Sequence, residues 1–208
     1  MQNTTQERPQ TRVIRDQQES EPPPGLWTLE SLVDACWRKG IDYEETPNLA
    51  SLQGFAVSCG QTFLISVRSN LPPDEKLYTL AHELGHIARG RMYTTTIGQV
   101  LEWLDPSLAA FQDTAQESTA HLWAAHLLVS PEVFASCYAH AHQRLPTARS
   151  EELLGSAMQR TAECLVVPRH AVELWYTHQQ EVPTPTPTEW LLDVDDRHPS
   201  GISGPLRD

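Results

Sequence analysis

The sequence has no apolar run long enough to cross a membrane, and its first residues, Met-Gln-Asn-Thr-Thr-Gln-Glu-Arg, lack the apolar segment of a secretion signal. Its four cysteines are far apart and form no C-x-x-C pair: Cys36, Cys59, Cys137 and Cys164. This pattern is typical of reduced thiols and disfavours a disulfide framework or a cysteine metal site. We therefore expect a cytoplasmic protein without a membrane-spanning segment.

Basic residues are also scarce. The chain of 208 residues has 15 Lys and Arg against 27 Asp and Glu, a formal net charge of −12. An acidic surface repels phosphate backbones, so direct binding to nucleic acid is not expected. Such a charge is typical of a protein kept soluble by its surface, and it would also favour a basic protein substrate.

The composition of both ends is unlike that of a folded domain. Residues 1–25 are polar and end in Glu-Pro-Pro-Pro-Gly, and residues 179–208 are rich in proline and acidic residues. Both segments are predicted to be disordered or loosely attached, with at most weak docking through Trp190 and the two leucines after it. Residues 26–178 remain, enough for one domain with a hydrophobic core.

The periodicity of this domain predicts an α+β fold. Apolar residues recur with helical spacing from Leu29 to Trp37, a short strand is expected near Ile41, and two more are expected on either side of Gly60. Further helices are predicted over residues 74–90, 107–129 and 150–165, and from Pro131 and Pro168 onward. We expect a small, mostly antiparallel sheet packed on several helices, with a mainly helical C-terminal half.

Residues 82–86 read His-Glu-Leu-Gly-His. On a helix, positions i and i+4 lie on one face, so His82 and His86 can reach the same metal ion, while Glu83 points to a neighbouring sector. Zinc prefers imidazole nitrogen, and a catalytic zinc keeps one position open for water. The motif therefore predicts two metal ligands and a general base of a metallopeptidase.

The surroundings of this motif favour a helix. Apolar residues at helical spacing define one face away from the His-Glu-His set: Leu77, Leu80, Ala81, Leu84, Ile87 and Ala88. Asp74 is expected as the N-cap and Gly90 as the residue that ends the helix. Residues 91–106 have no regular pattern, and we expect a loop over the site.

A third protein ligand is needed for a catalytic zinc. The downstream candidates are Glu102, Asp105, Asp113, Glu117, His121 and His126. Glu117 and His121 are four apart on a predicted helix and share a face, whereas His126 points elsewhere. If that helix crosses the first, Glu117 is a possible ligand with His121 close by.

Two segments resemble the ImmA/IrrE family of metallopeptidases, which carries F-T-x-A-H-E-x-G-H and, later, E-x-x-A-N-x-F-A-A-x-L-L-M-P. They are Tyr78-Thr-Leu-Ala-His-Glu-Leu-Gly-His-Ile and Glu117-Ser-Thr-Ala-His-Leu-Trp-Ala-Ala-His-Leu-Leu-Val-Ser-Pro. The resemblance spans roughly residues 26–178 and implies a minimal zincin-like domain. It implies that His82, His86 and Glu117 are metal ligands and that Glu83 is the general base.

The second segment departs from the family pattern at several positions. His121 stands where the family has Asn or Asp, a position that in related glutamate-type zincins steadies a ligand histidine through its second nitrogen. Trp123 replaces the family's Phe, and the proline is shifted to Pro131. None of these changes removes an implied ligand or the base. Tyr93 is a candidate donor for the oxyanion, although a tyrosine there is more often a plain rim residue.

The resemblance implies a zinc-dependent endopeptidase, with manganese as an alternative metal, that cleaves a helix-turn-helix repressor and so relieves repression of stress, phage or mobile-element genes. One alternative is a catalytically weak relative that binds a DNA-binding protein, as in a toxin–antitoxin pair. Another is a transcription factor, with a helix-turn-helix around Val166-Val167-Pro168. The few basic residues of that segment instead favour helices that cover the core.

Overall fold

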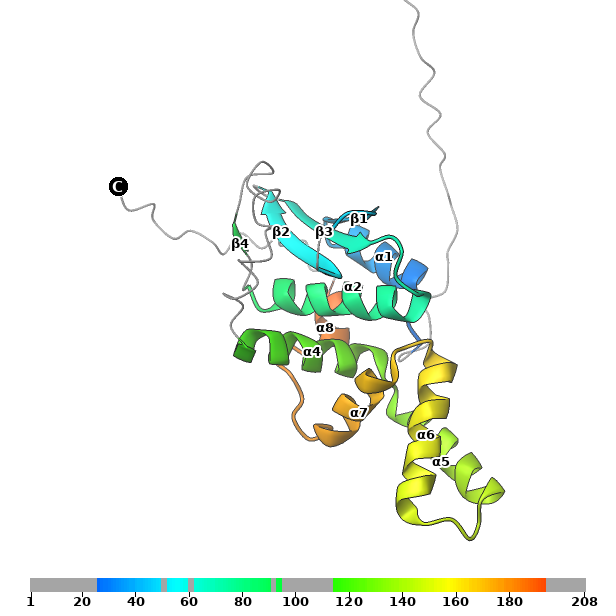
Figure 1. Ribbon diagram of the computed structural model, residues 1–208. Helices are drawn as coiled ribbons and strands as arrows, with labels where there is room; N and C mark the ends of the chain where they lie inside the picture. The colour runs from blue at the N-terminus through cyan, green and yellow to red at the C-terminus, as the bar shows by residue number, and fades with distance from the viewer. Residues whose placement is uncertain (1–25, 50–51, 60–61, 91–92, 95–113, 194–208) are drawn as a thin grey trace, which may run out of the picture.

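The computed structural model describes residues 26–49, 52–59, 62–90, 93–94 and 114–193 (Figure 1). Within these residues the elements are α1 (Leu29–Arg38), β1 (Ile41–Thr46), β2 (Gly54–Cys59), β3 (Thr62–Arg68), α2 (Pro73–Ala88), β4 (Tyr93–Thr94), α4 (Thr114–Leu128), α5 (Pro131–Arg144), α6 (Ser150–Leu165), α7 (Arg169–Thr177) and α8 (Pro187–Leu192). This arrangement confirms the predicted α+β class and its mainly helical C-terminal half.

The four-stranded sheet has the order β1-β3-β2-β4. Strands β2 and β3 form the antiparallel pair expected around Gly60, but β1 pairs with β3 in parallel and β4 pairs with β2 in parallel. The expectation of a mostly antiparallel sheet was therefore wrong, and the sheet is mixed. The reason is topological: β3 inserts between β1 and β2, so that β1 pairs with the second strand of the hairpin and not with the strand that follows it in sequence.

Helix α2 lies between the sheet and α4, and is the central element of the fold (Figure 1). Its predicted apolar residues are buried except for Ala88, which is partly buried. The other side of the helix is covered as well, because Tyr78, Thr79, His82 and Glu83 are also buried. An amphipathic pattern suggested one buried face, whereas contacts with β2 on one side and α4 on the other enclose most of the helix.

The start of α2 differs from the prediction. The helix begins at Pro73 with Pro72 as the N-cap, so Asp74 lies within the first turn and is not the cap. Proline suits the first helical position, taken here by Pro73, because its ring fixes a helical φ and its missing N–H is one that the first turn leaves unpaired. The end is as predicted, since Gly90 has a φ of +62° just after the C-cap.

The segment expected as a C-terminal tail is in part packed on the fold. Helix α8 contacts α1, α2 and α4, and Leu191 is buried. The Trp190 ring lies edge-on to Trp123, with ring centroids 5.8 Å apart, and the Lys39 Nζ atom lies 4.8 Å from the Trp190 centroid. Trp190 and Leu191 therefore dock more firmly than their proline-rich surroundings suggested, whereas Leu192 is exposed.

Helices α6 and α7 follow one another through Val166, which has a left-handed φ of 52°. Helix α7 packs on α4 and buries Ala171, Val172 and Trp175. It thus covers the core, as the sequence favoured. None of the helices in the described part of the chain is long and apolar enough to span a membrane.

Candidate metal centre

The candidate site is formed by α2 and α4, which run antiparallel to each other. Glu117 lies near His82 and His86, whereas His121, one turn further along α4, lies near Tyr78, one turn earlier on α2. The close approach depends on Gly85. A Cβ atom there would lie 3.1 Å from the Ala120 carbonyl oxygen and 3.2 Å from the Trp123 Cβ. A glycine on the contact face therefore lets the second helix bring its side chains to the first.

Three donor atoms converge between these helices. The His82 and His86 Nε2 atoms are 3.1 Å apart. The Glu117 Oε2 atom lies 3.2 Å from the His82 Nε2, and the Glu117 Oε1 atom lies 3.5 Å from the His86 Nε2. Among the described residues, His82, His86 and Glu117 are the group of His, Cys, Asp and Glu side chains arranged closely enough to hold a metal ion. The set predicted from the motif and the resemblance is thus brought together.

The donor set fits a divalent transition metal. Ligand atoms bound about 2.0–2.2 Å from a tetrahedral ion lie about 3.3–3.6 Å from one another, close to the separations found here. Two imidazoles and one carboxylate, with a position left for water, form a common catalytic zinc set. One feature is unusual: the buried Nδ1 atom of His82 has no hydrogen-bond partner in the described part of the chain, although a ligand histidine generally donates from its second nitrogen.

The charges of the three residues support one another. Hydrogen bonds to His82 and His86 hold the pKa of Glu117 well below its usual value, so the carboxylate is ionised at neutral pH. Burial acts to lower the pKa of His86, but the hydrogen bond to Glu117 and the charge of Glu83 outweigh it, and the pKa is raised. An ionised carboxylate therefore faces both imidazoles, an arrangement that favours a cation between them.

Glu83 is buried beside this group, between α2 and the sheet. Burial raises the pKa of its carboxyl group, and the charge of Glu117 adds to this, while His82, His86 and the Ala56 backbone N–H, which donates to the carboxylate, act in the opposite direction. Gly54 lets the strand approach, because a Cβ atom there would lie 3.5 Å from the Glu83 Cγ and only 2.6 Å from the Thr79 Cγ2. Strand β2 thus fixes the carboxylate next to the three donors.

His121 does not take the position expected for a residue that steadies a ligand histidine. Its ring lies against the His82 ring, with centroids 4.2 Å apart, but its Nδ1 is hydrogen-bonded to the Tyr78 hydroxyl at 3.0 Å. Loss of hydration and then the neighbouring His82 lower the pKa of His121 to about 4, so it is neutral at pH 7.

The other candidates from the sequence lie apart from this group or outside the described residues. The His126 Nε2 atom lies 3.4 Å from the His178 carbonyl oxygen, away from the donors. Glu102, Asp105, Asp113 and most of the loop over residues 91–106 lie outside the described residues. The backbone of Tyr93 pairs with Val57 in the sheet, and its side chain is not described.

Two groups that contribute to the candidate site were not identified by the sequence reasoning above. Tyr78 stands one turn before His82 and on the same face of α2, a spacing that could have identified it. The backbone N–H of Ala56 carries no signal in the sequence, because every residue type except proline would supply it there.

A comparison with protein families agrees with this geometry. Residues 48–147 match the model of the IrrE N-terminal-like domain, peptidase family M78, and the matched region contains both α2 and α4. No curated protein and no solved structure matches the chain. Residues 48–147 thus belong to the IrrE N-terminal-like domain family, as the resemblance to ImmA/IrrE metallopeptidases predicted.

Proposed function

We propose that the protein is a metal-dependent endopeptidase in which His82, His86 and Glu117 bind the metal and Glu83 is the general base. The observation that carries this proposal is the convergence of the three donor atoms beside a buried fourth side chain, Glu83, whose pKa is raised. A purely structural cluster would have no reason to bury an additional carboxylate against two histidines and a glutamate, since each buried charge costs free energy.

The side chains then divide the reaction between them. A metal ion held at this site would acidify water and polarise the carbonyl of the peptide bond. Glu83 takes one proton from the attacking water and delivers it to the nitrogen of the leaving amine. The Ala56 N–H holds the Glu83 carboxylate in place during both transfers. Zinc is the metal that two imidazoles and a carboxylate favour, and manganese is compatible with the same set.

The substrate that we propose is a helix-turn-helix repressor, whose cleavage relieves repression. The resemblance to the ImmA/IrrE family supports this choice. The net charge of −12 is also suited to a basic DNA-binding protein. Because such a repressor acts in the cytoplasm, we place the enzyme there. We assign the peptidase domain to residues 26–178, with α8 as an additional packed segment from residues 179–208.

The test is cleavage by zinc-loaded protein of the helix-turn-helix repressor encoded next to it, or of a fluorescence-quenched peptide library if no such neighbour exists. Glu83→Gln should retain zinc and lose about three orders of magnitude in kcat, as expected when a general base is removed. Glu152→Gln, an exposed change on α6, is the matched control and should cleave like the wild type. Equal cleavage by wild type and Glu83→Gln would refute the proposal.

Within the described residues the Nδ1 atom of His82 has no partner, and this favours one second candidate, a weakly catalytic relative that binds a DNA-binding protein without cleaving it. In that case the protein would form a stable complex with the repressor in the presence of zinc, and the repressor would stay intact.

A further inference from the structure

Tyr78 and His121 form a pair at the edge of the metal centre. The Tyr78 hydroxyl and the His121 Nδ1 are 3.0 Å apart, and the two rings are nearly parallel, at 13°. Tyr78 is 3% exposed, and the His170 ring on α7 lies edge-on to it, with centroids 4.7 Å apart. Part of His121 is exposed, although its ring loses hydration against its neighbours. One partner is therefore fixed in the core, while the other reaches the surface of the site.

The direction of this hydrogen bond follows from the partners that are present. If His121 donated from Nδ1, the buried Tyr78 hydroxyl would need another acceptor for its own proton, and the described residues provide none. If Tyr78 donates, one hydrogen bond pairs both the hydroxyl proton of Tyr78 and the lone pair on the His121 Nδ1. Tyr78 is always protonated at neutral pH, since burial raises its pKa further above the usual value. Tyr78 is therefore the donor, and His121 accepts at Nδ1.

This hydrogen bond determines which nitrogen of His121 carries the proton. A neutral imidazole that accepts at Nδ1 is protonated at Nε2. In the described part of the chain the Nε2 group of His121 has no acceptor, while the ring lies against the ligand His82. A hydrogen-bond donor is thus presented beside the metal centre with nothing in the described structure to receive it.

Resting on the proposed function, we propose that His121 is the donor for the carbonyl oxygen of the peptide bond that is cleaved, and that Tyr78 is the positioning residue that sets its tautomer. A neutral donor suits this role, because it stabilises negative charge on the oxygen without competing as a cation for the metal position. Nor is His121 a fourth metal ligand, because Nδ1 is engaged by Tyr78 and Nε2 carries a proton.

The two partners also depart together from the family motif given above. The motif has phenylalanine at the position of Tyr78 and asparagine at the position of His121, and in this chain the two replacements contact each other. A hydroxyl without the imidazole would be left buried and unpaired, and an imidazole without the hydroxyl would have no fixed tautomer.

The tautomer can be measured without any substrate. In long-range ¹H–¹⁵N spectra of zinc-loaded protein labelled at histidine, His121 should show a protonated Nε2 and an unprotonated Nδ1. Its signals would be assigned by their loss in His121→Gln. Tyr78→Phe should mix the two tautomers, whereas His126→Gln, which changes a histidine bonded elsewhere, should leave the His121 signals unchanged. A protonated Nδ1, or coordination of zinc by His121, would overturn the proposal.

The kinetic test uses two replacements of similar size. His121→Leu removes the donor and should lower kcat about 100-fold with little change in KM, as expected for the loss of one donor to an oxyanion. His121→Gln places an amide N–H near the position of Nε2 and should recover most of this loss. Equal losses in both variants would indicate a structural role and overturn the proposal. The proposed function has its own test and is refuted if zinc-loaded wild type cleaves no faster than Glu83→Gln.

Discussion

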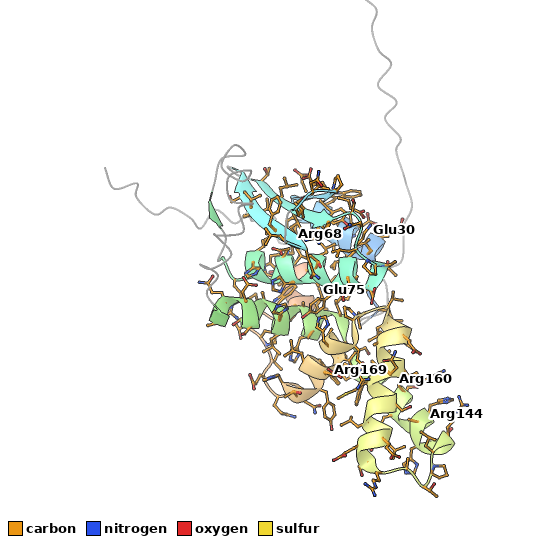
Figure 2. All side chains as sticks on the ribbon, in the orientation of Figure 1. Glu30, Arg68, Glu75, Arg144, Arg160 and Arg169 are labelled. Carbon is orange, nitrogen blue, oxygen red and sulfur yellow. The ribbon has the colours of Figure 1, made fainter. Side chains whose placement is uncertain are left out.

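The α2–α4 pair and the α5–α6 hairpin show how differently two antiparallel helix pairs can be used in one chain. Helices α2 and α6 have 16 residues each, but α2 buries ten of them and α6 only six. The hairpin extends away from the sheet, and Figure 2 shows Arg144 and Arg160 on it, far from the centre of the fold. The buried residues of α6 are apolar apart from one threonine, whereas those of α2 include His82 and Glu83.

The difference shows which helix pair gives up stability in order to hold buried ionisable side chains. Burial of ionisable groups costs free energy unless they are paired, and the α2–α4 pair accepts that cost in the interior of the fold. The α5–α6 hairpin has no such cluster among its described residues. Its glycine, Gly155, has no atom within 4 Å of the position that a Cβ would take. Variants matched between the two pairs can therefore test whether the packing of α2–α4 serves the metal centre.

The largest effect is expected at Gly85. Gly85→Val should destabilise the protein by about 3 kcal/mol, because the new side chain would collide with the Ala120 backbone and can be accommodated only by separation of α2 and α4. Chemical denaturation measures the change, and zinc affinity should fall with it. A stable Gly85→Val protein with normal zinc affinity would show that the close approach is not needed.

Removal of the third ligand comes next. Glu117→Gln should weaken zinc binding at least about 100-fold, or about 2.7 kcal/mol, because the neutral amide lacks the charge that balances the metal. Competition with a chromophoric chelator provides the measurement. Glu163→Gln on α6 is the control, and an equal effect of the two variants would contradict the assignment of Glu117.

A smaller effect of opposite sign is expected at His121. His121→Asp offers the buried His82 Nδ1 an acceptor, at the position that steadies a ligand histidine in related zincins, and should strengthen zinc binding about tenfold, or about 1.4 kcal/mol. The same chelator competition detects this, and kcat should nevertheless fall because the donor is lost. Weaker zinc binding in this variant would mean that the introduced carboxylate does not reach His82.

The smallest effect is expected on the hairpin. Gly155 lies within α6 with no atom near the position of a Cβ, so Gly155→Ala should stabilise the protein by about 0.7 kcal/mol through helix propensity alone. Thermal unfolding measures the gain. Zinc affinity should not change, and a change would indicate that the hairpin is coupled to the metal centre.

The parts of the site that could be predicted from the sequence are those that depend on local spacing. His82, Glu83 and His86 fall within one turn of a helix, so their relation is independent of the rest of the fold. The end of α2 at Gly90 was predictable for the same reason, since a residue with positive φ follows the helix there.

What could not be predicted depends on how distant elements meet. The tie between Tyr78 and His121 requires the antiparallel register of α2 on α4, which no spacing within either helix reveals. Glu117 was one of six candidates until the resemblance singled it out. The parallel pairing of β1 with β3 and the docking of Leu191 likewise depend on tertiary packing, which outweighed the local patterns.

The most direct test of the metal centre is the zinc content of the purified chain after equilibrium dialysis. The arrangement of His82, His86 and Glu117 predicts one zinc ion per chain, which is lost when both histidines are replaced by alanine. Absence of bound zinc in the wild type, or its retention in the double variant, would contradict the account.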